Sequence, residues 1–200
     1  WLYKMFGIDA ELLIDHAWGY ETCRMSDIKN YHSEEHSLSN GQVLMRNYSF
    51  EEALVIVREM TDNLALDLFE KGLVTSSLTL WIAYDHRYEH EASKGTVKLE
   101  RESNSSKKII DAVEDLYLRI TDRYTGIRRI EVCANRVAPE RYVQYSLFDD
   151  PKQTDKERHL QEAVLNVKQR YGKNAIMRGS NLLECSTYRE RNEQIGGHRA

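Results

Sequence analysis

The order in which two hydrophobic periodicities follow one another constrains this chain more than any other feature. Four segments alternate apolar and polar residues with a period of two, which indicates strands, and two segments repeat apolar residues every three to four positions, which indicates helices. Along residues 37–137 the order is strand, helix, strand, strand, helix, strand. This is the order of a split βαβ unit. We therefore predict an α+β fold, a ferredoxin-like βαββαβ domain with a four-stranded sheet and two helices on one of its faces.

The alternation also predicts which strand residues face the helices. The four predicted strands cover residues 41–48, 74–84, 96–101 and 127–137. In the second strand Leu80 and Ile82 alternate with Trp81, and in the fourth Ile130 follows Arg129. Because successive side chains of a strand point to opposite faces, the apolar set faces the helices, and Trp81 and Arg129 lie on the open face.

Both predicted helices have recognisable ends. Ser49 is a good N-cap residue, and Glu52 three positions later completes a capping box. This helix ends at Gly72. The second helix starts at residues 103–106 and ends near Tyr124–Gly126. Residues 50–71 carry six acidic and two basic residues, and we expect these acids to face solvent.

The flanking regions have weaker patterns. Residues 1–20 predict a short helix ending at Gly19, and residues 21–36 predict a linker. Residues 138–150 are irregular, and residues 173–200 are mostly polar. A further helix is predicted over residues 152–171, with an apolar stripe that we expect to dock on the domain: Leu160, Val164, Val167 and Tyr171.

The net charge of −4 hides an uneven distribution. Residues 1–36 carry seven acidic and three basic residues, whereas residues 94–136 carry ten basic and seven acidic residues. A basic surface is typical of a domain that binds nucleic acid. The candidate basic residues form two groups. We expect Arg46, Lys98 and Arg129 on the open face of the sheet, and Arg101, Lys107, Lys108, Arg128 and Arg136 at strand ends and rims.

Several classes of protein and site are excluded or disfavoured. No uncharged apolar run reaches the roughly 18 residues of a membrane span, so we expect no integral membrane segment. Three cysteines without a CxxC pair fit a reducing cytosol. His86 and His90 lie in a predicted hairpin loop, so we expect no metal there. Since the chain begins at Trp1, we expect it to be an excised piece of a longer protein.

Four stretches carry a resemblance to a known family. They are GIDAELLIDHAWGYE (Gly7–Glu21), HSLSNGQVLMRNYS (His36–Ser49), QYSLF (Gln144–Phe148) and RYGKNAIMRGSNLLECSTYRERNEQIGGHRA (Arg170–Ala200). Together they resemble the C-terminal part of a Y-family, UmuC/DinB-like translesion DNA polymerase of the Gram-positive UmuC-like type. The resemblance divides the chain into a thumb end (1–25), a tether (26–36), a little-finger DNA-binding domain (37–137), a loop with a clamp-binding motif (138–150) and a C-terminal helix and tail (151–200).

The resemblance implies two partners, primer–template DNA and the sliding clamp. The eight basic residues named above would contact the DNA backbone without reading its sequence. Five residues that match the family's Q-x-x-L-F motif would bind the clamp: Gln144, Tyr145, Ser146, Leu147 and Phe148. The palm domain, whose carboxylates hold Mg²⁺, would lie upstream of Trp1. We therefore expect this chain alone to be non-catalytic and without a cofactor, and the parent to be a cytoplasmic, error-prone polymerase of the SOS response. The sequence predicts no oligomeric state.

Two alternatives come from other classes. One is a ferredoxin-like module that binds RNA or a protein. An RNA-recognition motif carries aromatic residues on its third strand, whereas GTVKLERE (Gly95–Glu102) has none. The other is a ferredoxin-like domain that binds a small molecule, but no glycine-rich phosphate loop or paired acid and base occurs in the sequence.

Overall fold

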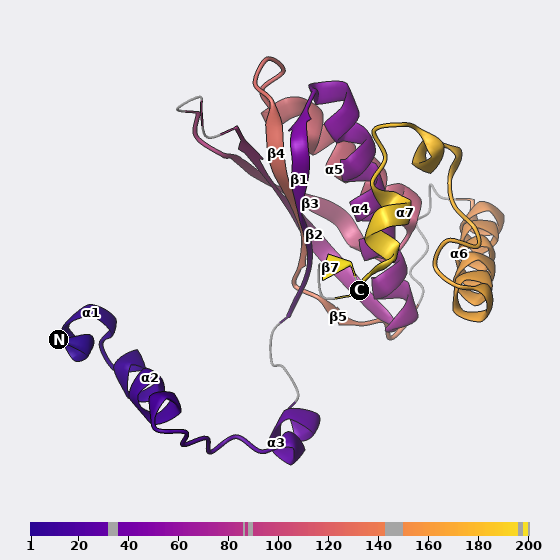
Figure 1. The fold of residues 1–200 in the computed structure, drawn as a ribbon. Helices are drawn as coiled ribbons and strands as arrows, with labels where there is room; N and C mark the ends of the chain where they lie inside the picture. The colour runs from indigo at the N-terminus through magenta and orange to yellow at the C-terminus, as the bar shows by residue number, and fades with distance from the viewer. Residues whose placement is uncertain (32–35, 86, 88–89, 143–149, 196–197, 200) are drawn as a thin grey trace. The chain divides into compact units, whose positions relative to one another are not determined.

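The computed structural model describes residues 1–31, 36–85, 87, 90–142, 150–195 and 198–199. The chain forms two compact units, Trp1–Glu35 and His36–Ala200. The second unit holds the sheet and the helices that pack on it (Figure 1).

The predicted βαββαβ order is confirmed. The elements are β1 (Ser37–Tyr48), α4 (Phe50–Glu70), β2 (Leu73–Tyr84), β3 (Ser93–Ser103), α5 (Ser106–Ile120) and β4 (Ile127–Asn135). The strands lie in the order β1-β4-β2-β3 with every neighbouring pair antiparallel, so β1 and β3 form the edges. A two-residue strand, β5 (Ala138–Pro139), pairs with the start of β2.

One face of the sheet is covered and the other is open. In the central pair, Leu80 lies opposite Val132 and Ile82 opposite Ile130, and all four side chains are fully buried. They pack with apolar residues of α4 and α5 into a single core. Figure 1 shows both helices on the same side of the sheet. The side chains of alternate parity, including Trp81 and Arg129, therefore lie on the open face, as the alternation predicted.

The start of α4 carries the predicted capping box. The Glu52 amide donates to Ser49 Oγ at 3.2 Å, and the Ser49 amide donates to Glu52 Oε2 at 3.0 Å. Arg46 also donates to the Glu52 carboxylate at 2.6 Å. The Arg46 guanidinium, with the Ser49 amide second, lowers the pKa of Glu52 to about 2. The helix start therefore keeps a charged cap at neutral pH, and that charge complements the helix dipole.

The expectation that the acids of α4 all face solvent is wrong for two of them. Glu59 is 2% exposed and Asp62 is 7% exposed. The Ser186 hydroxyl donates to Glu59, and Arg178 donates to the Asp62 carboxylate at 2.7 and 2.9 Å. Both partners belong to the chain after residue 172, so the C-terminal segment covers this side of α4.

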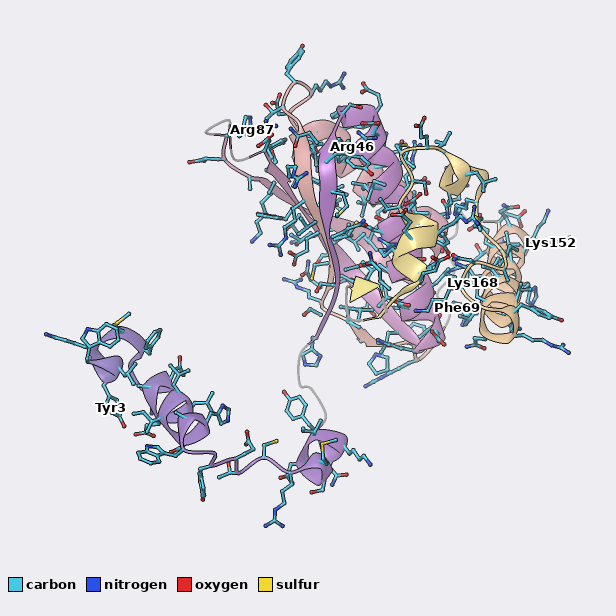
Figure 2. All side chains as sticks on the ribbon, in the orientation of Figure 1. Tyr3, Arg46, Phe69, Arg87, Lys152 and Lys168 are labelled. Atoms are coloured by element: carbon cyan, nitrogen blue, oxygen red, sulfur yellow. The ribbon has the colours of Figure 1, made fainter. Side chains whose placement is uncertain are left out.

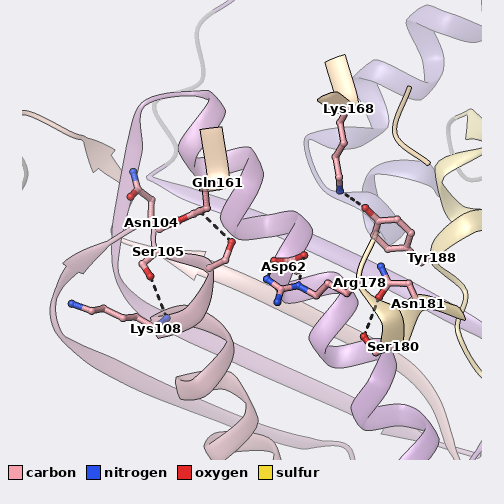
Figure 3. A network of polar contacts seen from close by, with 11 residues as sticks. Asp62, Asn104, Ser105, Lys108, Gln161, Lys168, Arg178, Ser180, Asn181 and Tyr188 are labelled. Atoms are coloured by element: carbon pink, nitrogen blue, oxygen red, sulfur yellow. Dashed lines mark hydrogen bonds and ion pairs between the residues drawn. The ribbon is translucent and has the colours of Figure 1, made fainter. Parts of the chain in front are cut away.

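The predicted C-terminal helix is α6 (Pro151–Tyr171), and only part of the predicted stripe faces the domain. Leu160 and Tyr171 are exposed and Val164 and Val167 are half-buried, whereas Gln161 is buried. Its amide donates to the Asn104 carbonyl at 3.0 Å and to Ser106 Oγ at 3.1 Å (Figure 3). The hydrogen bonds that hold α6 to the domain are therefore made by polar side chains, which an apolar stripe could not reveal.

Short elements follow α6. They are η1 (Gly179–Leu182), α7 (Tyr188–Asn192), β6 (Gln194–Ile195) and β7 (His198–Arg199). Tyr188 is buried, and its hydroxyl accepts a hydrogen bond from Lys168 of α6 (Figure 3). Asn192 and Asn174 are hydrogen-bonded at 2.7 Å. These contacts tie the polar tail to the rest of the unit.

The first unit holds α1 (Leu2–Phe6), α2 (Asp9–Ala17) and α3 (Met25–Asn30). The predicted short helix corresponds to α2, and Gly19 adopts a positive φ of 75° after it. The expectation of a linker throughout residues 21–36 is wrong for α3, whose start is capped by Asp27 accepting from the Arg24 amide at 2.9 Å. Among the residues that the structure describes, no helix combines the length and apolarity that crossing a membrane requires.

Candidate nucleic-acid interface

The open face of the sheet is built mainly from small polar side chains. The pairing register aligns Ser39, Cys133, Thr79 and Thr96 in one row across the four strands, and Ser37, Asn135, Ser77 and Lys98 in the next. A third row contains Gly41, Glu131, Trp81 and Lys94. Small side chains keep the surface flat, so an extended ligand can approach the strands closely.

Hydrogen bonds between side chains connect the strands across this face. Asn135 Nδ2 donates to Thr79 Oγ1 at 2.9 Å, and the hydroxyls of Thr79 and Thr96 share a hydrogen bond of 2.8 Å. The Cys133 thiol donates to Asn135 Oδ1 at 3.4 Å. Burial, and to a smaller extent the Glu131 carboxylate, raise the pKa of Cys133 above its ordinary value. The thiol therefore stays protonated at neutral pH, where it is a poor nucleophile and acts as a hydrogen-bond donor on the open face.

Trp81 and Arg129 form the prominent feature of the open face. The Arg129 guanidinium carbon lies 5.1 Å from the centroid of the Trp81 ring, which is cation–π geometry. Arg129 Nη2 also lies 3.5 Å from Glu131 Oε2. The side chains of Arg129 and Glu131 are 51% and 38% exposed, so both reach solvent.

The predicted DNA-contacting residues fall into separate places. Lys98 and Arg129 lie on the open face as expected. Arg128 lies at an irregularity of β4, where the register shifts between Arg129 and Ile127. Arg136 directly follows β4 and has a positive φ of 50°. Lys98 and Arg129 thus belong to the open face, and Arg128 and Arg136 lie at the two ends of β4.

The expected position of Arg46 on the open face is wrong. It lies where the register between β1 and β4 is irregular, between Val43 and Tyr48, and it pairs with Glu52 of α4. Figure 2 shows Arg46 close to α4. Its guanidinium carbon also lies 4.3 Å from the centroid of the Tyr48 ring. The physical reason is that Val43 and Met45, both strongly exposed, take the open side of this edge strand.

Three further candidates lie near the helices. Lys107 and Lys108 belong to the first turn of α5, and Lys107 Nζ lies 4.0 Å from Glu157 of α6. Arg101 lies near the end of β3. Arg101 and Lys108 line a groove of about 910 Å³ between β3, α5 and α6. Lys98 lines the same groove, as do Glu100, Glu102 and Asp111. The acids balance the bases in this groove, so it is a poorer phosphate site than the open face.

Lys94 is a basic residue of the open face that the sequence prediction missed. It lies opposite Trp81 in the register between β2 and β3. The predicted third strand began at residue 96, whereas β3 begins at Ser93. The signal was present, because Lys94, Thr96 and Lys98 share one parity.

The five clamp-motif residues, Gln144–Phe148, lie outside the described residues. The chain on either side of them is held to the domain. Glu140 accepts two hydrogen bonds of 2.8 Å from Arg158 of α6 and one of 3.2 Å from Asn104. Asp150 caps α6 by accepting from the Lys152 amide at 3.0 Å.

A comparison with protein families identifies the chain. Residues 35–147 match the model described as the impB/mucB/samB family C-terminal domain, which is more than half of the chain. The chain belongs to the impB/mucB/samB family. The matched region of this family member contains the five-stranded sheet, both helices that cover it and most of the segment between β5 and α6.

Two curated proteins extend the match. The family member is 24% identical over 201 residues to DNA polymerase IV 2 of Bacillus subtilis (strain 168), which covers 98% of this chain and 47% of that protein. It is 21% identical over 168 residues to DNA polymerase IV 2 of Halalkalibacterium halodurans (strain ATCC BAA-125 / DSM 18197 / FERM 7344 / JCM 9153 / C-125), covering 84% of this chain and 40% of that protein. The chain thus spans less than half the length of these relatives. The predicted resemblance to the C-terminal part of a Y-family polymerase is confirmed.

Solved structures are also similar to this family member. One is the complex of a beta-clamp processivity factor and the little finger domain of PolIV, with 12% identity and a TM-score of 0.40, covering 57% of this chain and 100% of that one. Another is a post-insertion binary complex of Dbh DNA polymerase, with 16% identity and a TM-score of 0.37, covering 69% of this chain and 38% of that one.

Proposed function

We propose that this chain is the DNA-binding and clamp-tethering part of a translesion polymerase. The observation that carries the proposal is the open sheet face, where Lys94, Lys98 and Arg129 border a flat surface of small polar residues. Cationic side chains that replace the counterions of DNA phosphates give binding that depends on salt and not on sequence. Such binding suits a module that must hold both damaged and undamaged primer–template.

The proposed contacts differ from the eight basic residues expected at first. Lys98, Arg128, Arg129 and Arg136 remain, and Lys94 joins them. Arg46 is the weakest of the original candidates, because its charge is already engaged by Glu52 on the covered side. Arg101, Lys107 and Lys108 lie near α6 and its acidic residues, so we assign them no primary contact with the duplex.

The test measures primer–template binding by the 200-residue chain over a range of salt concentrations. Each lost phosphate contact makes the negative slope of log K against log salt shallower by about 0.9. We expect the triple variant K94Q/K98Q/R129Q to bind more weakly, with a slope that is shallower by about 3. Arg46→Gln is the matched control, since it removes one exposed cation from the covered side and should leave the affinity unchanged. No binding of the wild-type chain at low salt would refute the proposal.

We also propose that Gln144–Phe148 bind the sliding clamp. Leu147 and Phe148 would fill an apolar pocket of the clamp, and the tether would raise the effective concentration of the polymerase at the primer end. The double variant L147A/F148A should lose clamp binding and keep its far-ultraviolet circular dichroism. Leu160→Ala, which truncates an exposed leucine of α6, should keep clamp binding. Unfolding of the double variant would instead indicate that the motif packs within the chain.

Polymerisation belongs to the whole protein in this proposal. The family resemblance assigns the chemistry to a palm domain whose carboxylates hold Mg²⁺, and this chain contains no palm-like segment. We therefore expect the chain alone to extend no primer and the parent to act in the cytoplasm, in error-prone synthesis during the SOS response. Primer extension across an abasic site, with and without the Leu147 and Phe148 substitutions in the parent, tests this expectation.

A further inference from the structure

Glu131 places a carboxylate on the open face of the sheet. It is the acidic residue beside Arg129, two positions along the same strand and on the same face, and the two side chains are 3.5 Å apart. A charge-assisted hydrogen bond is shorter, at about 2.8 Å. Because both groups are exposed and the contact is long, the pair is easily separated.

The neighbours of Glu131 fix where its side chain can lie. Gly41 lies opposite it on β1, and a Cβ atom at Gly41 would be 3.7 Å from Glu131 Cγ. Trp81 lies opposite it on β2. Glu131 thus lies between Gly41 on β1 and Trp81 on β2 in the register, and Arg129 is the diagonal neighbour of Trp81.

Arg129 has two partners that differ in how they respond to a phosphate. The Trp81 ring offers its π face, which a guanidinium can keep while its N–H groups turn to an anion. Glu131 offers a carboxylate, which competes for those same N–H groups. A phosphate can therefore displace Glu131 without displacing Trp81.

We propose that Trp81, Arg129 and Glu131 form a phosphate-responsive exchange site for the DNA backbone. In the free protein the Glu131 carboxylate pairs with the Arg129 guanidinium. In the complex a backbone phosphate replaces Glu131, and Trp81 keeps the guanidinium on the face. Glu131 thus weakens binding, and Trp81 is a positioning residue. This inference rests on the proposed DNA-binding function and adds the residues that set the strength of binding.

The first experiment is a double-mutant cycle on primer–template affinity, measured with the 200-residue chain. We expect Glu131→Gln to tighten binding about two- to five-fold, the range of an exposed ion pair. In the Arg129→Gln background the same change should have little effect, because the residues act as a pair. Glu100→Gln, which removes an exposed acid from β3, is the control for charge alone. An equal gain from Glu131→Gln in both backgrounds, or from Glu100→Gln, would overturn the proposal.

The second experiment uses Trp81 as a reporter. The chain has three tryptophans, and Trp1 and Trp18 are strongly exposed in the first unit. The variant W1F/W18F leaves Trp81 as the single fluorophore, and we expect its emission to change as duplex is added. Trp81→Leu should weaken binding, and Trp81→Phe, which keeps an aromatic face, should restore part of it.

The outcomes separate the two claims. If the chain binds duplex but Trp81 emission does not change, the exchange site is refuted and the proposed function stands. If the chain binds no duplex at low salt, the proposed function fails and the exchange site fails with it. A weakened Trp81→Leu variant that Trp81→Phe does not rescue would also count against the positioning role.

Discussion

Replacing Gln161 by leucine should weaken the docking of α6 and leave the sheet folded. Among the described residues of α6, Gln161 is the one that is buried, with 9% of its surface exposed. Both of its donated hydrogen bonds end on the start of α5, at the Asn104 carbonyl and at Ser106 Oγ. Asn104 and Ser106 are themselves buried, so water cannot easily replace the lost donors.

The size of the effect follows from these contacts. A buried polar group left without a partner costs about 1–3 kcal/mol. The Ser106 hydroxyl can rotate to another partner and the leucine adds apolar contact, so we take the lower part of the range for two groups, about 2 kcal/mol. This lowers the equilibrium constant for docking by a factor of about 30.

Native-state hydrogen exchange measures this docking directly. Amides of α6 should lose protection by about thirty-fold, whereas amides of β2 and β4 should keep theirs, because regions open as separate units. The matched control is Gln169→Leu on the same helix, an exposed residue bonded to Glu70 at 2.8 Å. Its effect should stay within about 0.5 kcal/mol. Unchanged exchange of α6 in Gln161→Leu, or equal loss across the sheet, would refute the reasoning.

Three further predictions concern the stability of the second unit. The Arg158 guanidinium, opposed by burial, lowers the pKa of Glu140 below its ordinary value of 4.5. The ion pair therefore stabilises the docking of α6 above pH 4.5, and this stabilisation is lost as the pH falls through the folded-state pKa. In Glu140→Gln, hydrogen exchange of α6 should depend less on acid pH. A Cβ atom at Gly95 would lie 2.8 Å from Leu116 Cδ1 in the core, so Gly95→Ala should cost about 1–3 kcal/mol in urea unfolding. Tyr117→Phe removes a buried 2.8 Å hydrogen bond to the first residue of α4 and should cost about 1 kcal/mol in the same assay, with the fold unchanged by circular dichroism.

Much of the fold could be predicted because its local signals agree with one another. Ser49 and Glu52 identify the start of α4, and the alternation around Leu80 and Ile130 identifies the covered face of the two central strands. These strands are buried on one side only, so their pattern has a single interpretation. The edge strand β1 is different, because apolar residues occupy both of its faces. A shift of one residue exchanges the faces, which is why Arg46 was assigned to the wrong side.

The polar docking of the C-terminal region could not be predicted from periodicity. Hydrophobic spacing identifies α6 as a helix, but the side that meets the domain is chosen by Gln161 and Arg158, whose partners lie more than 50 and 15 residues away in the chain. The hydrogen-bond partners of Asp62 and Glu59 likewise lie more than 100 residues later in the chain. Polar pairs at such separations leave no regular pattern in a single sequence.

These internal pairs also change what the net charge means. Glu52, Glu59 and Asp62 are half of the acids on α4, and each is bonded within the unit. They therefore contribute little to the field that an approaching phosphate meets on the other side of the sheet. The charges on that side include those of Lys94, Lys98, Arg129 and the opposing Glu131. A whole-chain charge of −4 is thus compatible with DNA binding, and it predicts binding weak enough that one acid on the open face has a measurable effect.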